Sequence, residues 1–200
     1  MKSILLAASL LLSISLHAQS IPKVGEKAPD FVAKDQSGKT VDLKTLLRKG
    51  PVAVVFYRGY WCPNCNRALK SIQDSLGLLT TRNVTVVAIS PETPEGVAKT
   101  VKNTKASFSL ISDEGMKIIK SYGLGFAITP DMDAIHKQYN IDVAGNNGKS
   151  GHNLTRPAGF VIGKDGIIRY AYANTDPYAN SNSNNRVTVA QLLAHTGARP

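Results

Sequence analysis

A continuous apolar run, VAVVFY at residues 52–57, is the feature that most constrains the fold. A strand that is apolar at every position is typical of a parallel sheet covered on both faces. VTVVAI (84–89) and FSLIS (108–112) repeat the pattern, and apolar residues at helical spacing lie between the runs, at about 63–79 and 94–105. Strands that alternate with helices predict an α/β fold with a largely parallel sheet.

The rest of the chain completes this pattern. Residues 113–123 predict another helix with glycine at its end, and 158–173 predict a hairpin around Lys164-Asp165-Gly166. Residues of about 126–155 are rich in Asn and Gly and predict an irregular insertion with one helix near 131–139. The low-complexity patch ANSNSNNR (179–186) predicts a mobile loop before a short final helix.

The N-terminus has the layout of a secretory signal peptide. Lys2 precedes a mostly apolar stretch from Ile4 to Leu16, and Ala18 and Ser20 both offer cleavage sites. We expect a signal peptide at 1–18, with cleavage after Ser20 as the alternative, and one domain at 19–200. The apolar stretch is too short to span a bilayer comfortably, which disfavours an uncleaved anchor. The mature chain is therefore expected to be exported, to the periplasm if the source is Gram-negative, without stable membrane insertion.

The chain is basic, with a formal net charge of +10 from 24 Lys+Arg against 14 Asp+Glu. Its basic residues are scattered, and it has no dense Lys/Arg cluster or recognisable nucleic-acid motif. A solvated basic surface is the better interpretation, and nucleic acid is not expected as a partner.

The only two cysteines are Cys62 and Cys65. A disulfide that closes so short a loop stabilises a fold by only about 2 kcal/mol, so a purely structural bond is a poor explanation. A zinc site would need two more ligands, and the mature chain offers only His136, His152 and His195, none paired at ligand spacing. The sequence predicts no cofactor and no resident metal.

A redox pair explains the position better. Cys62 follows a central strand and starts a helix, where backbone N–H groups and the macrodipole favour a thiolate. Pro63 suits the first helical turn because its missing N–H costs nothing there. Cys65, one turn on, is within reach to resolve a mixed disulfide on Cys62. We therefore predict Cys62 as the attacking thiol and Cys65 as the resolving thiol.

Four stretches carry a family resemblance. They are VGEKAPDF, VVFYRGYWCPNC, VAISPETPE and RPAGFVIGKDGIIRYAYANTDP. Together they resemble the peroxiredoxin-like branch of the AhpC/TSA proteins, from about residue 24 to 194. The resemblance implies a thioredoxin-like three-layer α/β/α sandwich with a mixed central sheet. It also implies that Cys62 and Cys65 are the redox pair.

The same resemblance assigns supporting residues. Trp61 matches the aromatic residue before the first cysteine, where it either packs on the helix or shields the disulfide. Pro157 matches the proline that thioredoxin-fold proteins hold in the cis form beside the disulfide, where neighbouring backbone can pair with a substrate chain. Position rather than the resemblance brings in two arginines: Arg58 lies four residues before Cys62, and Arg156 is expected to come near it through the fold. Each is either a stabiliser of a thiolate or peroxide oxygen or a solvated surface residue.

Two reactions stay open. Peroxiredoxins place Thr or Ser three residues before the attacking cysteine and Pro seven before it, but here those positions hold Gly59 and Val55. The leading hypothesis is thus thiol–disulfide exchange with partner proteins, as in exported thiol reductases. The alternative is hydroperoxide reduction through a sulfenic acid on Cys62, with Cys65 resolving it. Either needs an external electron donor, for which a thiol carrier is expected.

A remote third alternative is a copper chaperone similar to the Sco proteins. Those share the fold and combine two cysteines with a distant histidine, and His152 lies in the irregular segment just before Pro157. The spacing argues against it, because the Sco cysteines are separated by three residues rather than two.

Overall fold

Strand β3 (Val52–Phe56) is buried at every position and lies at the centre of a five-stranded sheet. The computed structural model describes residues 20–176 and 186–196. The sheet order is β5-β4-β3-β8-β9, in which β3 runs parallel to β4 and antiparallel to β8. These strands span Ser109–Ser112 (β5), Thr85–Ser90 (β4), Ala158–Ile162 (β8) and Ile168–Ala173 (β9). The predicted strands and the predicted hairpin are confirmed.

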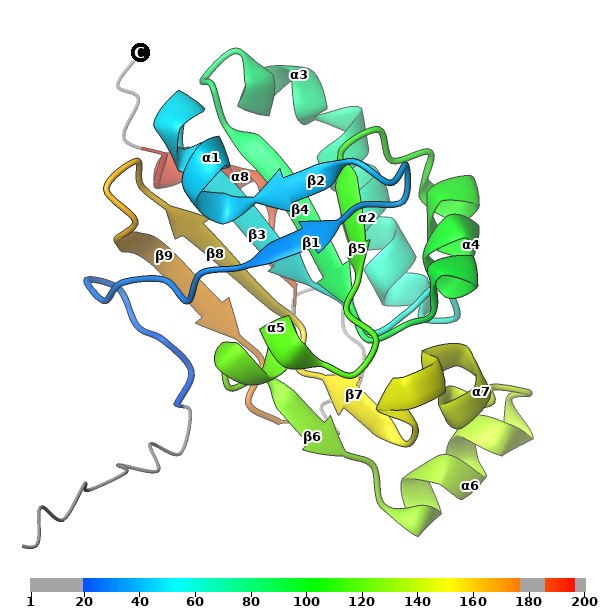
Figure 1. Ribbon diagram of the computed structural model, residues 1–200. Helices are drawn as coiled ribbons and strands as arrows, with labels where there is room; N and C mark the ends of the chain where they lie inside the picture. The colour runs from blue at the N-terminus through cyan, green and yellow to red at the C-terminus, as the bar shows by residue number, and fades with distance from the viewer. Residues whose placement is uncertain (1–19, 177–185, 197–200) are drawn as a thin grey trace, which may run out of the picture.

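Side chains of β3 alternate between two cores, one on each face of the sheet. Val52, Val54 and Phe56 join the first core, with residues of α1 (Leu43–Lys49) and α5 (Lys117–Ser121). Ala53 and Val55 join the second core, with residues of α2 (Pro63–Asp74), α4 (Pro94–Thr104) and α8 (Val189–Ala194). Burial on both faces explains why this strand is apolar throughout. The layered α/β/α architecture with a mixed sheet is the predicted one (Figure 1).

The helix predicted at about 63–79 is divided in two. It ends at Asp74, and α3 (Leu76–Thr80) follows after Ser75. Ser75 leaves helical backbone angles, with φ −107° and ψ 10°, and Gly77 comes soon after. Serine competes for backbone hydrogen bonds and glycine weakens helices, so the break has a local cause that apolar spacing does not reveal.

Residues 125–155 fold into an excursion with more regular structure than predicted. Strands β6 (Gly125–Ala127) and β7 (Asn153–Thr155) pair antiparallel, and two helices lie between them, α6 (Pro130–Gln138) and α7 (Val143–Asn147). A short 3-10 turn, Gly148–Ser150, follows α7. The expected helix near 131–139 is α6. The prediction that the rest of this segment is irregular was wrong, because strands of three residues carry too little periodicity to detect. Figure 1 shows the excursion at the lower right of the sheet.

The N-terminal part adds a small hairpin, β1 (Val32–Lys34) and β2 (Thr40–Asp42), before α1. Within residues 20–176 and 186–196, no helix is both long and apolar enough to cross a membrane. The predicted signal peptide at 1–18 lies outside the described residues, as does the ANSNSNNR patch except for Arg186.

Candidate active site

Cys62 lies at the junction between β3 and α2, where it is the N-cap of the helix. Its backbone is extended, with φ −90° and ψ 105°, and its sulfur accepts the backbone N–H of Cys65 at 3.4 Å. Pro63 occupies the first helical turn, as predicted. The sulfur thus takes the place of the oxygen that usually caps a helix, at the positive end of the macrodipole.

The two thiols differ in access and in acidity. Cys62 is 6% exposed and Cys65 is 1% exposed, and neither is in a disulfide. Their sulfurs lie 2.7 Å apart, with the Cys65 thiol donating to Cys62. This hydrogen bond, with the backbone N–H and nearby arginines, lowers the pKa of Cys62 to about 6. Burial, and then the same hydrogen bond, raises the pKa of Cys65 well above its ordinary value.

Arg186 brings a positive charge to the cysteine pair. It is buried, and its Nη2 lies 3.9 Å from the Cys62 sulfur and 3.8 Å from the Cys65 sulfur. The charges of Arg186 and Arg58 both lower the pKa of Cys62. Arg156, the other expected cation, instead lies over the Phe126 ring, 5.2 Å from its centroid. The structure therefore places one of the two predicted arginines where its charge acts on the nucleophile.

Sequence reasoning missed Arg186. The residue ends a polar, low-complexity stretch and lies 124 residues after Cys62, so nothing local marks it as part of the site. The only available signal is its position immediately before the apolar residues that start the last helix. Val187 packs into the same core as the cysteines and holds the preceding arginine against them.

Glu92 is a second residue that the sequence did not reveal. Its side chain is fully buried, beyond the end of β4, and its carboxyl oxygens accept three hydrogen bonds. The donors are the backbone N–H of Tyr60 at 2.7 Å, the Ser90 hydroxyl at 3.2 Å and the Thr100 hydroxyl at 3.3 Å. Burial outweighs these bonds and raises the pKa of Glu92 to about 7, and the charge of Cys65 adds to the shift.

Glu92 also explains the glycine that precedes the cysteines. A side-chain carbon built on Gly59 would lie 2.6 Å from Trp61 Nε1 and 2.8 Å from Glu92 Oε1. Such distances are too short for non-bonded atoms, so any larger residue would have to displace the indole or the carboxyl group. The place where a hydroxyl side chain would stand is thus occupied by Trp61 and Glu92.

Comparisons with known proteins agree with this geometry. The family model described as the AhpC/TSA family matches residues 24–171. The chain belongs to the AhpC/TSA family. The matched range includes the CxxC pair, Cys62 and Cys65.

Relatives within the AhpC/TSA family divide between two activities. The chain is 36% identical over 100 residues to chloroplastic peroxiredoxin Q of Populus jackii, covering 50% of this chain and 46% of that protein. It is 31% identical over 107 residues to thiol-disulfide oxidoreductase ResA of Halalkalibacterium halodurans, covering 53% of this chain and 60% of that protein. The chain therefore spans about half the length of these relatives.

Solved structures support the fold. Peroxidoxin BcpB from Mycobacterium tuberculosis matches with a TM-score of 0.61 and 21% identity, over 76% of this chain and 85% of that chain. A cysteine-to-serine mutant of the peroxiredoxin 6 of Arenicola marina matches with a TM-score of 0.64 and 17% identity, over 86% of this chain and 70% of that chain. These likenesses show the thioredoxin-like fold.

One expectation drawn from the family resemblance was wrong. The Arg156–Pro157 peptide bond is trans, since no cis bond occurs in the described parts of the chain. Pro157 continues an extended path from β7 into β8, and the flanking backbone is already bonded: Arg156 N–H donates to Leu124 and the Pro157 carbonyl accepts from Asn174. The proposed pairing of this backbone with a substrate chain is therefore removed.

Trp61 connects this AhpC/TSA site with the excursion. Its ring meets the His136 ring of α6 edge-on, with centroids 5.3 Å apart. It packs both against the core that contains the cysteines and against a small core inside the excursion. Trp61 therefore joins α6 to the first turn of the cysteine helix.

The histidine considered for copper faces elsewhere. His152 Nδ1 lies 3.3 Å from an Asp133 oxygen. Among residues 20–176 and 186–196, no group of three or more His, Cys, Asp or Glu side chains is arranged to hold a metal. The geometry gives the copper-chaperone alternative no support.

Proposed function

We propose that this chain is an exported thiol–disulfide oxidoreductase that exchanges electrons with cysteines of partner proteins. The observation that carries the proposal is the asymmetry of the pair: the more exposed thiol, with a pKa of about 6, touches a sealed thiol with a raised pKa. Such a pair separates the attacking role from the resolving role. The buried Glu92 near them supplies a base for the resolving step.

The reaction proceeds in two balanced steps. In the first, the Cys62 thiolate attacks one sulfur of a partner disulfide, forms a mixed disulfide and releases the other partner sulfur as a thiolate. In the second, Cys65 gives its proton to Glu92, and the new thiolate attacks Cys62. The second partner sulfur leaves, and the Cys62–Cys65 disulfide forms. Two electrons pass to the partner, and an external thiol carrier returns them.

The roles of the charged groups follow from this sequence of steps. The hydrogen bonds from Cys65, with smaller contributions from the charges of Arg186 and Arg58, hold Cys62 as a thiolate near neutral pH, which prepares the first step. Glu92 has a pKa of about 7, so about half of it is ionised at pH 7 and able to take a proton. Cys65 stays protonated because burial and its hydrogen bond to the Cys62 sulfur raise its pKa. Once the mixed disulfide forms, Cys62 carries no charge, and Cys65 can lose its proton.

Hydroperoxide reduction is the second candidate. The low pKa of Cys62 and the adjacent arginines favour it, because a peroxide needs a thiolate and nearby donors. Against it stands the occupied space at Gly59, which leaves no room for a hydroxyl side chain to orient the peroxide. The proposed exchange needs no group at that position.

The test compares two oxidants on the reduced protein. Trp61 fluorescence reports oxidation by hydrogen peroxide and by a peptide disulfide, with Cys62→Ser as the control that must lose both signals. We expect the peptide disulfide to oxidise the protein much faster than it oxidises a free thiol of similar pKa. Hydrogen peroxide should oxidise the protein no faster than it oxidises that free thiol. A peroxide rate far above that of an ordinary thiolate, lost in Cys62→Ser, would instead establish a peroxidase.

Export is a separate part of the proposal and has its own test. The Lys2 charge and the apolar stretch after it support it. Expressed with its full N-terminus in a Gram-negative host, the protein should appear in the periplasm with Gln19 or Ile21 as its first residue, as read by mass spectrometry. Leu11→Arg, which interrupts the apolar stretch, should leave the full-length chain in the cytoplasm. A periplasm free of the unaltered protein would refute export.

A further inference from the structure

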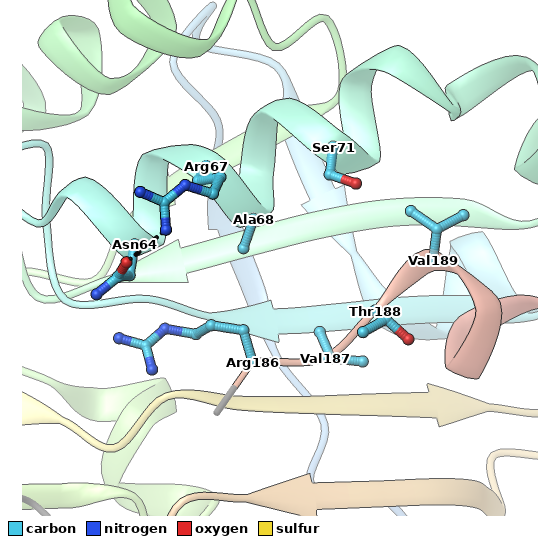
Figure 2. Close-up of a pocket in the computed structure, with 8 residues that line it drawn as sticks. All are labelled: Asn64, Arg67, Ala68, Ser71, Arg186, Val187, Thr188 and Val189. Carbon is cyan, nitrogen blue, oxygen red and sulfur yellow. Dashed lines mark hydrogen bonds between the residues drawn. The ribbon is translucent and has the colours of Figure 1, made fainter. Parts of the chain in front are cut away.

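A groove with a volume of about 190 Å³ runs beside the cysteine pair. One wall is helix α2, and the other is the segment that leads into α8 (Figure 2). The lining residues belong to these two elements: Asn64, Arg67, Ala68, Ser71, Arg186, Val187, Thr188 and Val189. Arg186 connects the groove to the active site, because it lines the groove and also contacts both sulfurs.

The groove is positively charged at the cysteine end. Arg67 on α2 and Arg186 on the facing wall place their guanidinium groups at the same end, close to Asn64 (Figure 2). Arg67 is exposed and donates to Asn64 at 2.8 Å, so its guanidinium is oriented along this wall. None of the eight described residues that line the groove is acidic. Toward the other end the walls carry the apolar residues Ala68, Val187 and Val189 together with the hydroxyl groups of Ser71 and Thr188 (Figure 2).

The dimensions suit a short piece of extended chain. Asn64 to Ser71 covers two turns of α2, about 10 Å along the axis. Three residues of extended polypeptide span about the same length. A chain lying here would place one residue at the charged end and its neighbours against the apolar walls.

We propose that this groove binds an acidic segment of the partner polypeptide, with an Asp or Glu carboxylate between Arg67 and Arg186 and within about two residues of the partner cysteine. The inference rests on the proposed exchange reaction and names its kind of substrate. Guanidinium groups on two facing walls match a carboxylate, which arginine binds with paired hydrogen bonds. The electron transfer is unchanged: the dithiol is oxidised and the partner disulfide is reduced to two thiols.

The experiment uses two symmetric peptide disulfides that differ only at one position. In the first peptide, Glu stands two residues after the cysteine, and in the second that residue is Gln. Second-order rates of oxidation of the reduced mature protein are measured by Trp61 fluorescence at low and physiological salt. We expect the Glu peptide to react about tenfold faster, and the ratio to fall as salt rises.

Variants separate the groove from the overall positive charge. Arg67→Gln should bring the ratio of the two peptide rates close to one. Arg48→Gln removes the same charge from α1, on the opposite face of the sheet, and should leave the ratio unchanged.

Three outcomes oppose the proposal, each in its own way. Equal rates for both peptides, with both reduced, would refute the acidic specificity and leave the exchange reaction standing. A preference that survives in Arg67→Gln would assign it to net charge rather than to the groove. No reduction of either peptide would refute the exchange reaction itself.

Discussion

The active site has a local half and a distant half, and the two contribute different things. Cys62, Pro63 and Cys65 come from one strand–helix junction, which fixes where the nucleophile stands. Glu92 follows β4 and Arg186 precedes α8; the Arg186 charge lowers the pKa of Cys62, and Glu92 is the base that we propose for Cys65. In the proposed reaction the distant half governs how this pair reacts, and each half can be altered separately.

Removing the local nucleophile should have the largest effect. Cys62→Ser should reduce disulfide exchange at least about a thousandfold, because serine is not ionised near neutral pH. Cys65→Ser should behave differently: the first step continues, and the mixed disulfide on Cys62 accumulates because nothing resolves it. Mass spectrometry of each variant after incubation with a peptide disulfide checks both expectations.

The order of the two thiols is what this pair of variants can overturn. If Cys65→Ser stays free of adduct while Cys62→Ser forms one, the attacking and resolving roles must be exchanged. The exposures of 6% and 1% predict the opposite.

Neutralising the distant base should give the next largest effect. Glu92→Gln keeps the size of the side chain but cannot accept a proton, so the second step should slow by about a hundredfold at pH 7.5. In the unaltered protein the second step should accelerate as pH rises through about 7, where Glu92 ionises. Stopped-flow measurement of the second thiol release checks this. Glu95→Gln, which changes an exposed acid three residues later in the first turn of α4, is the matched control. An unchanged second step in Glu92→Gln would contradict the role.

The same substitution has a consequence for stability. The pKa of Glu92 is raised from 4.5 to about 7, so the folded state holds this proton more tightly than the unfolded chain. The contribution is fully present below about pH 4.5 and is lost as pH rises through 7, a change of about 3 kcal/mol. Glu92→Gln should remove this loss. Urea unfolding at pH 5 and pH 8 measures it, and an equal pH dependence in both proteins would refute it.

Removing the distant cation should have a smaller effect, about tenfold. Without Arg186 the pKa of Cys62 should rise from about 6, so fewer molecules carry the thiolate at pH 6.5. The attack rate of Arg186→Gln should therefore fall at pH 6.5 and recover toward pH 9. Thiolate absorbance against pH gives the pKa directly. Arg156→Gln, whose arginine lies over Phe126, serves as the control and should leave the pKa in place. Equal shifts of the Cys62 pKa in the two variants would show that Arg186 has no special effect on Cys62.

The difference between the halves also explains what sequence could predict. β3, α2 and the cysteines are encoded by neighbouring residues, so apolar periodicity and helix-start chemistry locate them together. Arg186 reaches the sulfurs across 124 residues, and Glu92 is enclosed by donors from the loop after β3, from β4 and from α4. Such contacts exist only once the sheet order is fixed, and no local pattern encodes them.

Pro157 shows a different kind of error: the family resemblance predicted a cis bond where the local sequence is consistent with a trans bond. A proline at the start of a strand is consistent with a trans bond, and the extended path from β7 to β8 requires nothing else. The excursion gave a third kind of failure. Its α6 has a proline and acidic residues in the first turn, which mark it in the sequence, whereas the three-residue strands β6 and β7 depend on each other for their existence.

The smallest expected effect lies where the excursion meets the site. His136→Ala removes the ring that packs edge-on against Trp61, which should cost about 0.5–1.5 kcal/mol of stability and alter Trp61 fluorescence. The exchange rate should change less than twofold, because His136 adds neither charge nor proton to the sulfurs. His195→Ala removes a similar contact with Tyr170, 4.8 Å away, at the far end of the chain, and should leave the fluorescence unchanged. If His136→Ala lost as much exchange rate as is expected for Arg186→Gln, the excursion would take part in the reaction. The active site would then have three contributing regions rather than two.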